Sequence, residues 1–186
     1  MSPGGRPRLR DLTSADTDRV LQFTRETGVF REEELGIAGE VFADCVNHPG
    51  PSGGAENDRV GAGLVGAELS SAPTTPRPYY GLGAELDGRL VGWICWGQTP
   101  CTEGTWDLYW LAVDPAAHGH GVGTALTEEM ERRLTGIARL IAVDTSGRPD
   151  YTPTRNFYLA RGYQAVARVP DFYAPGDDQV IFTKLL

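Results

Sequence analysis

An apolar segment that leads into a glycine-rich turn is the feature that most constrains the fold of this chain. Residues 108–113, Leu-Tyr-Trp-Leu-Ala-Val, form the longest uninterrupted apolar run, and Asp114-Pro115 ends it. Glycines follow at positions 119, 121 and 123, and apolar residues then recur at helical spacing as Val122, Leu126, Met130 and Leu134. This pattern predicts a buried strand, a tight turn and a helix that begins within the turn.

The glycine-rich turn is suited to holding a phosphate group. Backbone N–H groups at the start of a helix point outward and carry the partial positive charge of the helix dipole, so they bind a phosphate without a lysine. A P-loop nucleotide hydrolase is excluded, because the only lysine of the chain, Lys184, follows no glycine-rich loop. The dinucleotide fingerprint G-x-G-x-x-G is not met either, because residue 124 is Thr. The residues alone leave open a cofactor phosphate, a nucleotide, and a turn that holds no ligand.

Composition narrows the class of protein further. With 186 residues, of which 40% are hydrophobic and 23% charged, the chain has the size and composition of one globular domain. A net charge of −8 argues against a nucleic-acid partner, and the short apolar runs argue against a membrane span. The three cysteines are an odd number and lack metal-site spacing, so a reducing, cytoplasmic location is expected.

The order of predicted elements indicates an α+β fold. Residues 1–8 are interpreted as a disordered tail, followed by a single domain over 9–186 that contains a long Gly-, Pro- and Ser-rich loop at about 47–78. Periodicity predicts helices at 13–28, 32–46, 122–137 and 152–161, and strands at 79–86, 89–96, 105–113, 140–144, 164–169 and 180–186, with a loop at 171–179. A mixed sheet with helices follows from this order.

Two separated motifs resemble those of the GCN5-related N-acetyltransferase (GNAT) superfamily. The family signature Arg/Gln-x-x-Gly-x-Gly/Ala, preceded by Leu-Ala-Val-x-Pro, is matched by His118, Gly121 and Gly123 after Leu111 to Pro115. The second landmark, a Tyr four residues before a Gly-Phe/Tyr pair, is matched by Tyr158 and Gly162-Tyr163. The resemblance implies a mostly antiparallel central sheet flanked by helices, with the fourth and fifth strands splayed apart.

The sequence departs from the family pattern at two positions. His118 stands where the family has Arg or Gln, so the contribution of that side chain to the cofactor is in question. Tyr151 stands seven residues before Tyr158, where many members carry a cofactor-contacting Asn, and that role is not transferred to Asn156.

The resemblance also implies a co-substrate, acetyl-CoA, lying between the splayed strands. The backbone of Leu111, Ala112 and Val113 would pair with the pantetheine arm like an added strand. The residues that would hold the pyrophosphate are His118, Gly119, His120, Gly121, Val122, Gly123 and Thr124. No metal is expected, because His118 and His120 have no third ligand nearby in sequence.

Two residues are candidates for catalysis. Tyr158 is the predicted acid, because a phenol stays protonated at neutral pH and can donate to a departing sulfur. Asp107 is the candidate base. Because side chains alternate along a strand, Asp107, Tyr109 and Leu111 are expected to lie on the same face. Glu103, in the loop just before this strand, is the alternative candidate for the base. A chain of water molecules could also remove the proton without any single base.

The resemblance places the acceptor between the loop that joins the first two helices and the loop that joins the last two strands. The candidate substrate-binding residues are Glu33, Glu103, Tyr173 and Asp177. Acidic and aromatic groups would suit a cationic amine. The same residues are equally typical of a solvated helix start and an ordinary turn, and that interpretation stays open.

The leading hypothesis is an acetyl-CoA-dependent N-acetyltransferase that transfers the acetyl group directly to a primary amine of a small molecule. A protein amine is the main variant within that class. The alternatives are a non-catalytic acyl-CoA-binding sensor or regulatory module, and a nucleotide binder on a similar sheet. A homodimer is expected only from the family.

Overall fold

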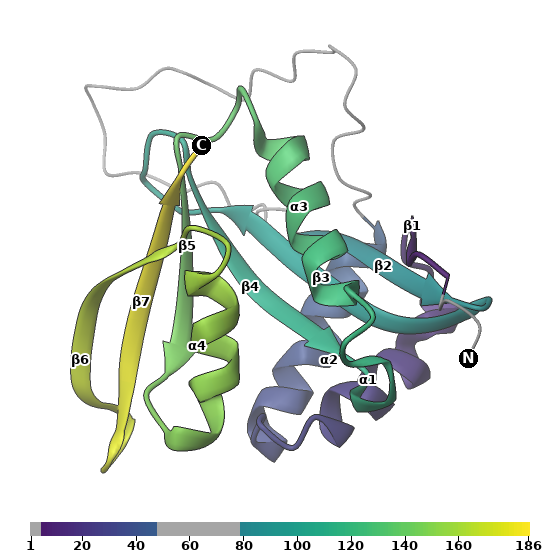
Figure 1. The fold of residues 1–186 in the computed structure, drawn as a ribbon, viewed down its shortest axis with the longest axis horizontal. Helices are drawn as coiled ribbons and strands as arrows, with labels where there is room; N and C mark the ends of the chain where they lie inside the picture. The colour runs from purple at the N-terminus through teal and green to yellow at the C-terminus, as the bar shows by residue number, and fades with distance from the viewer. Residues whose placement is uncertain (1–4, 48–78) are drawn as a thin grey trace, which may run out of the picture.

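The computed structural model describes residues 5–47 and 79–186, which build a seven-stranded sheet with helices on both faces (Figure 1). The strands are β1 (Arg8–Arg10), β2 (Tyr80–Leu86), β3 (Arg89–Gln98), β4 (Thr105–Val113), β5 (Leu140–Ser146), β6 (Gln164–Ala174) and β7 (Asp177–Leu185). The helices are α1 (Thr17–Glu26), α2 (Glu32–Asn47), α3 (Val122–Leu134) and α4 (Thr152–Leu159). Among the described strands, whose order is β1-β2-β3-β4-β5-β7-β6, neighbours are antiparallel except for the parallel pair β4–β5. The predicted α+β class is confirmed.

The structure differs from the predicted elements at both ends of the sheet. Arg8, the last residue of the predicted tail, already belongs to β1, which pairs with β2 and was not predicted. The loop predicted at 171–179 is wrong, because β6 and β7 continue through it as a hairpin that turns at Pro175-Gly176. Irregular pairing between Val169 and Ala174 conceals the alternation that would have revealed these strands. The loop predicted at 47–78 lies outside the described residues, apart from Asn47.

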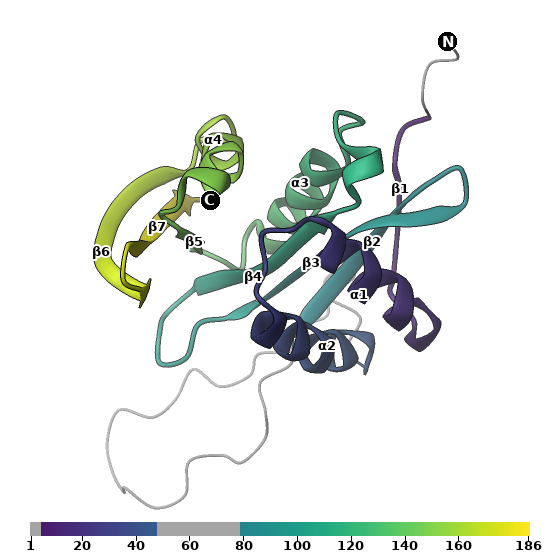
Figure 2. The same cartoon turned by 90° about the horizontal axis from the view of Figure 1, so that it is seen from below.

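Helices α1 and α2 lie on one face of the sheet and α3 and α4 on the other (Figure 2). A hydrophobic core forms between each pair of helices and the sheet. The first, here called the α1/α2 core, packs these helices on β3 and includes Phe23, Phe42 and Trp93. The second, the α3/α4 core, packs those helices on the other face and includes Leu126 and Tyr158. Each helix buries one apolar stripe and leaves its polar side outward. No helix in the described ranges combines the length and the apolar character needed to cross a membrane.

The sheet is divided where β4 meets β5. Pairing between these strands covers only four residue pairs, from Thr105–Leu140 to Leu108–Val143. Beyond this point β4 continues to Val113 paired with β3, whereas β5 continues to Ser146 paired with β7. The structure therefore has the splayed fourth and fifth strands that the family resemblance implied.

A bulge in β4 accounts for the splay. Leu108 pairs with Trp96 and Trp110 with Cys95, so Tyr109 is an extra residue without an opposite partner on β3. A bulge bends its strand and increases the local twist. The β4–β5 pairing ends at Leu108, directly before the bulge. We infer that the extra residue turns the second half of β4 away from β5.

Candidate active site

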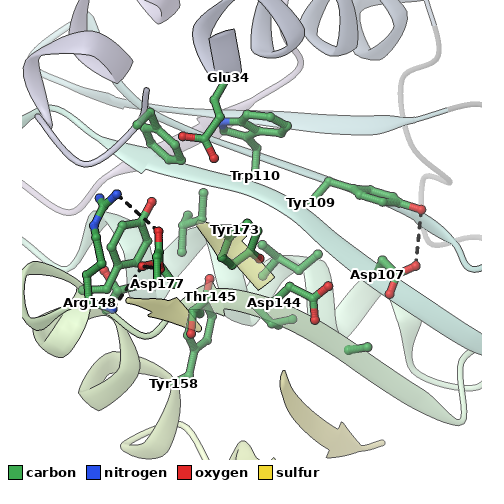
Figure 3. Close-up of a pocket in the computed structure, with 18 of the residues that line it drawn as sticks. Glu34, Asp107, Tyr109, Trp110, Asp144, Thr145, Arg148, Tyr158, Tyr173 and Asp177 are labelled. Atoms are coloured by element: carbon green, nitrogen blue, oxygen red, sulfur yellow. Dashed lines mark hydrogen bonds and ion pairs between the residues drawn. The ribbon is translucent and has the colours of Figure 1, made fainter. Parts of the chain in front are cut away.

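A cavity of about 280 Å³ opens where β4 and β5 part (Figure 3). Residues 107–111 of β4 and 142–146 of β5 form two of its walls. The remaining walls come from the segment that enters α2, the segment that enters α4, α4 itself and the β6–β7 hairpin. These contribute Phe30, Arg31, Glu34, Arg148, Tyr151, Thr154, Tyr158, Tyr173 and Asp177.

Tyr158 lies in the cavity wall with a free hydroxyl. The side chain is 3% exposed, and its ring packs against those of Phe157, Tyr163 and Phe182 with centroids 5.3–6.0 Å apart. Among the described residues no group forms a hydrogen bond with the hydroxyl, although the residue lines the cavity. Burial raises the pKa of Tyr158, so the phenol keeps its proton at neutral pH.

The face predicted for Asp107 is wrong because of the bulge at Tyr109. Trp110 and Ala112 pack in the α1/α2 core, whereas Leu111 packs against the α3/α4 core. Before the bulge the alternation of side chains between the two faces is reversed, so that the even-numbered Leu108 belongs to the α3/α4 core. Asp107 therefore points to the face opposite Leu111. Its carboxylate accepts hydrogen bonds from the hydroxyls of Thr99 (2.8 Å) and Tyr109 (3.3 Å) at one end of the cavity.

Asp144 is a second carboxylate in the cavity, which the sequence analysis did not identify. It directly follows Val143, the last β5 residue paired with β4, and its side chain is exposed toward the cavity. The amide of Gln179 donates to its Oδ2 atom (2.8 Å). Desolvation by the surrounding protein, together with the negative charge of Asp107, raises the pKa of Asp144. In the sequence this residue follows a short apolar run, a pattern that is typical of the end of a strand and does not indicate a catalytic residue.

Asp177 lies in the cavity wall, but its carboxylate is already bound. It is 4% exposed and accepts hydrogen bonds from Ser146 Oγ (2.5 Å) and an Arg31 guanidinium N–H (2.6 Å). A nitrogen of Arg148 lies 3.5 Å away. Asp177 thus fastens the β6–β7 hairpin to the segment before α2 and to the segment before α4. Tyr173, the other hairpin candidate, lines the cavity, and burial raises its pKa to about 12.

Two predicted substrate-binding residues lie elsewhere. Glu33 and Glu103 are exposed and do not line the cavity. Glu34, the neighbour of Glu33, lines it instead, and its Oε2 accepts a hydrogen bond from the backbone N–H of Arg31 (2.6 Å). Periodicity did not distinguish Glu33 from Glu34, because three consecutive glutamates open the helix.

The glycine turn has an open outer surface. Gly119 and Gly121 adopt left-handed φ angles of 81° and 75°, and a Cβ at either position would meet nothing within 4 Å. The first helical hydrogen bond of α3 runs from Ala125 N to Gly121 O, so the N–H groups of residues 122–124 precede it. The turn therefore fits a phosphate group, for which it offers free donors and a surface without side chains.

Other residues predicted to hold the cofactor surround this turn. A Cβ on Gly123 would lie 3.2 Å from the Phe157 ring, so this glycine permits close packing of α3 against α4. The Nε2 atom of His118 lies 3.2 Å from Val113 O, and His120 is hydrogen-bonded within the turn. Val122 is buried in the α3/α4 core.

Arg161 brings a positive charge to the same end of α3. Its guanidinium donates to the Thr124 hydroxyl and stacks on the Phe157 ring, 3.4 Å from the centroid. Desolvation lowers its pKa from the ordinary arginine value. The sequence analysis missed this residue, because it is separated from Thr124 by 37 positions.

The comparisons with known proteins agree with this geometry. The model of the acetyltransferase (GNAT) family matches residues 60–163, more than half of the chain. The chain belongs to the GNAT family. A GNAT protein from Desulfovibrio desulfuricans has a similar crystal structure, with 32% identity and a TM-score of 0.72, covering 96% of this chain and 97% of that one. An aminoglycoside 6'-N-acetyltransferase crystallised with coenzyme A shares the fold, with a TM-score of 0.66 and 17% identity over 96% of each chain.

Curated GNAT relatives match over a smaller part of the chain. An uncharacterized N-acetyltransferase from Methanocaldococcus jannaschii is 32% identical over 54% of this chain and 63% of its own length. An L-2,4-diaminobutyric acid acetyltransferase from Nocardia farcinica is 30% identical over 50% of this chain and 54% of its own length. The chain thus spans less than two thirds of the length of these relatives. Small-molecule amines are among the acceptors that such relatives are named for.

Proposed function

We propose that the chain is an acetyl-CoA-dependent N-acetyltransferase that transfers the acetyl group directly to a primary amine of a small molecule. The observation that carries the proposal is Tyr158, a buried phenol that lines the cavity between the splayed strands and whose hydroxyl has no hydrogen-bond partner among the described residues. Membership of the GNAT family supports the reaction type. A cavity of about 280 Å³ supports a small acceptor.

The reaction requires two proton transfers, and the cavity has a group for each. A bond forms between the acceptor nitrogen and the acetyl carbonyl carbon, and the bond from that carbon to sulfur breaks. Tyr158 donates a proton to the departing sulfur, and Asp144 accepts the proton that the nitrogen loses. Water in the cavity then returns the proton from Asp144 to Tyr158.

We propose Asp144 rather than Asp107 as the base. The Asp107 carboxylate accepts two hydroxyl hydrogen bonds within the paired part of β4, which stabilise its charge. Asp144 lies where the strands part and accepts one amide hydrogen bond. Its raised pKa makes the Asp144 carboxylate a better proton acceptor than an ordinary aspartate. Asp107 and Glu103 are then not needed as bases.

Acetyl-CoA supplies the thioester that reacts. In this proposal the turn from His118 to Thr124 holds the pyrophosphate through backbone N–H groups, and Arg161 adds a positive charge beside it. The backbone of β4 from Leu111 to Val113, which has no β5 partner, is available to the pantetheine arm. The open surface over Gly119 and Gly121 supports this placement.

Binding of acetyl-CoA tests the proposal most directly. We expect acetyl-CoA and CoA, but not ATP or NAD, to raise the melting temperature, by several degrees at a ligand concentration a hundred times the Kd. Gly121→Val should lower the affinity for acetyl-CoA at least about a hundredfold, because its side chain would occupy the surface that the phosphates approach. Thermal unfolding measures the shifts in melting temperature, and isothermal titration calorimetry measures the affinities.

Gly136→Val is the matched control for backbone strain. Gly136 also has a left-handed φ, of 85°, and open space around it, but it lies at the other end of α3. The control should therefore be destabilised to a similar degree and still bind acetyl-CoA. Normal binding by a folded Gly121→Val protein would contradict the cofactor placement. Binding of acetyl-CoA without turnover of any amine would identify the sensor alternative.

Asp144→Asn tests whether Asp144 acts as the base, because the substitution removes the charge and nearly preserves the shape of the side chain. We expect kcat to fall about ten- to a hundredfold, since water and Asp107 remain as weaker proton acceptors. The rising limb of the pH–rate profile, which in the parent reflects ionisation of Asp144 above the usual Asp range, should disappear. Asp107 on β4, Tyr173 on β6 and Gln179 on β7 are described polar groups that interact with Asp144.

The same variant should unfold at a slightly higher temperature at pH 7. A folded-state pKa above the unfolded value means that the contribution of Asp144 to stability is lost as the pH rises through the folded pKa. Removing the charge removes this cost, so the advantage of Asn should vanish near pH 3, where Asp144 is protonated. Unchanged kcat, with Asp107→Asn lowering it instead, would return the role of base to Asp107.

A further inference from the structure

The acceptor side of the cavity has three carboxylates that lack a cationic partner. Glu34 accepts a backbone N–H, Asp107 accepts two hydroxyls and Asp144 accepts a side-chain amide, as described above. Among the described residues, no ion pair involves any of the three. They come from α2, β4 and β5, so separate elements of the fold bring negative charge to one cavity (Figure 3).

The positive charges that line the cavity are already neutralised. Arg31 donates to Asp177 (2.6 Å) and also to the backbone oxygen of Tyr173 (3.3 Å). Arg148 lies 3.5 Å from Asp177 and is bound to Asp150 as well (3.1 Å). A substrate carboxylate entering the cavity would therefore find no free guanidinium among the described lining residues, and would meet three carboxylates instead.

The walls between these carboxylates are aromatic. The rings of Phe30 and Trp110 lie 6.0 Å apart, and Tyr109 packs edge-on against Tyr79 at 5.1 Å. Tyr173 covers the hairpin side. Aromatic faces attract ammonium groups and accommodate methylene chains. The unpartnered hydroxyl of Tyr158, in a side chain that is 97% buried, independently marks this cavity as a ligand site.

We propose that the acceptor is a diamine or polyamine that carries no carboxylate. This inference rests on the proposed function. One amine is acetylated beside Asp144 and Tyr158, while a second, charged amine is held by Glu34, with the aromatic walls along the connecting methylenes. The reaction is the balanced transfer described above, with one nitrogen–carbon bond formed for each carbon–sulfur bond broken.

Three commercial amines of equal chain length provide the test. 1,4-Diaminobutane has two ammonium groups, butylamine has one, and ornithine (2,5-diaminopentanoate) adds a carboxylate to the same four-carbon diamine. We expect kcat/KM for 1,4-diaminobutane to exceed that for each of the others about ten- to a hundredfold, the range for one charged hydrogen bond. The preference over butylamine should shrink as salt is added, because the charges are screened.

Variants assign the preference to particular residues. Glu34→Gln should lower kcat/KM for 1,4-diaminobutane about tenfold more than kcat/KM for butylamine, because only the diamine has a second ammonium group for Glu34 to hold. Glu33→Gln is the matched control, since it removes the same charge from the same helical turn without lining the cavity. It should leave the preference intact.

The outcomes distinguish this inference from the proposed function. Equal rates with butylamine and 1,4-diaminobutane, or a preference for ornithine or for a peptide N-terminus, would overturn the diamine proposal and leave the acetyltransferase proposal in place. Acetyl-CoA binding without acetylation of 1,4-diaminobutane would overturn it too. Failure to bind acetyl-CoA would instead overturn the proposed function itself.

Discussion

Replacing Tyr158 by Phe is expected to lower kcat about ten- to a thousandfold while the affinity for acetyl-CoA changes little. The substitution removes one hydroxyl and keeps the ring, whose packing against Tyr163 and Phe182 belongs to the α3/α4 core. Because that hydroxyl has no partner among the described residues, its loss leaves no buried group unpaired. Stability should therefore stay close to that of the parent, and steady-state kinetics with calorimetric acetyl-CoA binding separate the two effects.

Tyr163→Phe is the control for this experiment. Tyr163 is the aromatic neighbour of Tyr158, with ring centroids 5.4 Å apart, and it is 2% exposed without lining the cavity. Its replacement by Phe should leave kcat unchanged. Full activity of Tyr158→Phe, or an equal loss in both variants, would remove Tyr158 from the mechanism.

Asp177→Ala is expected to destabilise the protein by about 2–3 kcal/mol, with a fall of about 5–10 °C in melting temperature. The substitution leaves Arg31 and Arg148 facing one another without the carboxylate between them, and it leaves Ser146 without its acceptor. The effect stays below that of a fully buried pair, because the side chains of Arg31 and Arg148 are 39% and 28% exposed. Thermal and urea unfolding measure the loss.

The neighbouring Asp178 provides the comparison for Asp177. Asp178 pairs with Arg168 on the outer side of the hairpin, and the Arg168 side chain is 61% exposed. Asp178→Ala should therefore cost clearly less than Asp177→Ala. If the two losses were equal, Asp177 would not be the residue that fastens the hairpin to the rest of the protein.

Much of the fold follows from local signals in the sequence. The turn at Asp87-Gly88, the glycine turn before α3 and the apolar period of each helix are set by residues close together in the chain. The position of Tyr158 also followed from the sequence, because its spacing from Gly162 is a short-range motif. Such features need no knowledge of distant contacts.

The residues that the sequence did not reveal depend on contacts between distant segments. The bulge at Tyr109 arises from the pairing of β4 with β3, and nothing in an apolar run marks which residue is extra. Because the phase of the strand reverses there, alternation placed Asp107 on the wrong face. Asp177 resembled a turn residue, and only the folded chain brings Arg31 to it from 146 positions away.

The four residue pairs that join β4 to β5 leave the protein as two half-sheets with a short common seam. In an uninterrupted sheet, the backbone groups on the β5 side of residues 109–113 would contribute to folding stability. Here they contribute nothing across the gap until another molecule supplies the missing partners. The backbone groups along the gap between β4 and β5 are therefore available to a ligand and do not stabilise the fold. A molecule seated there would contact both half-sheets and resist their separation, so occupancy of the site and cohesion of the sheet are coupled properties.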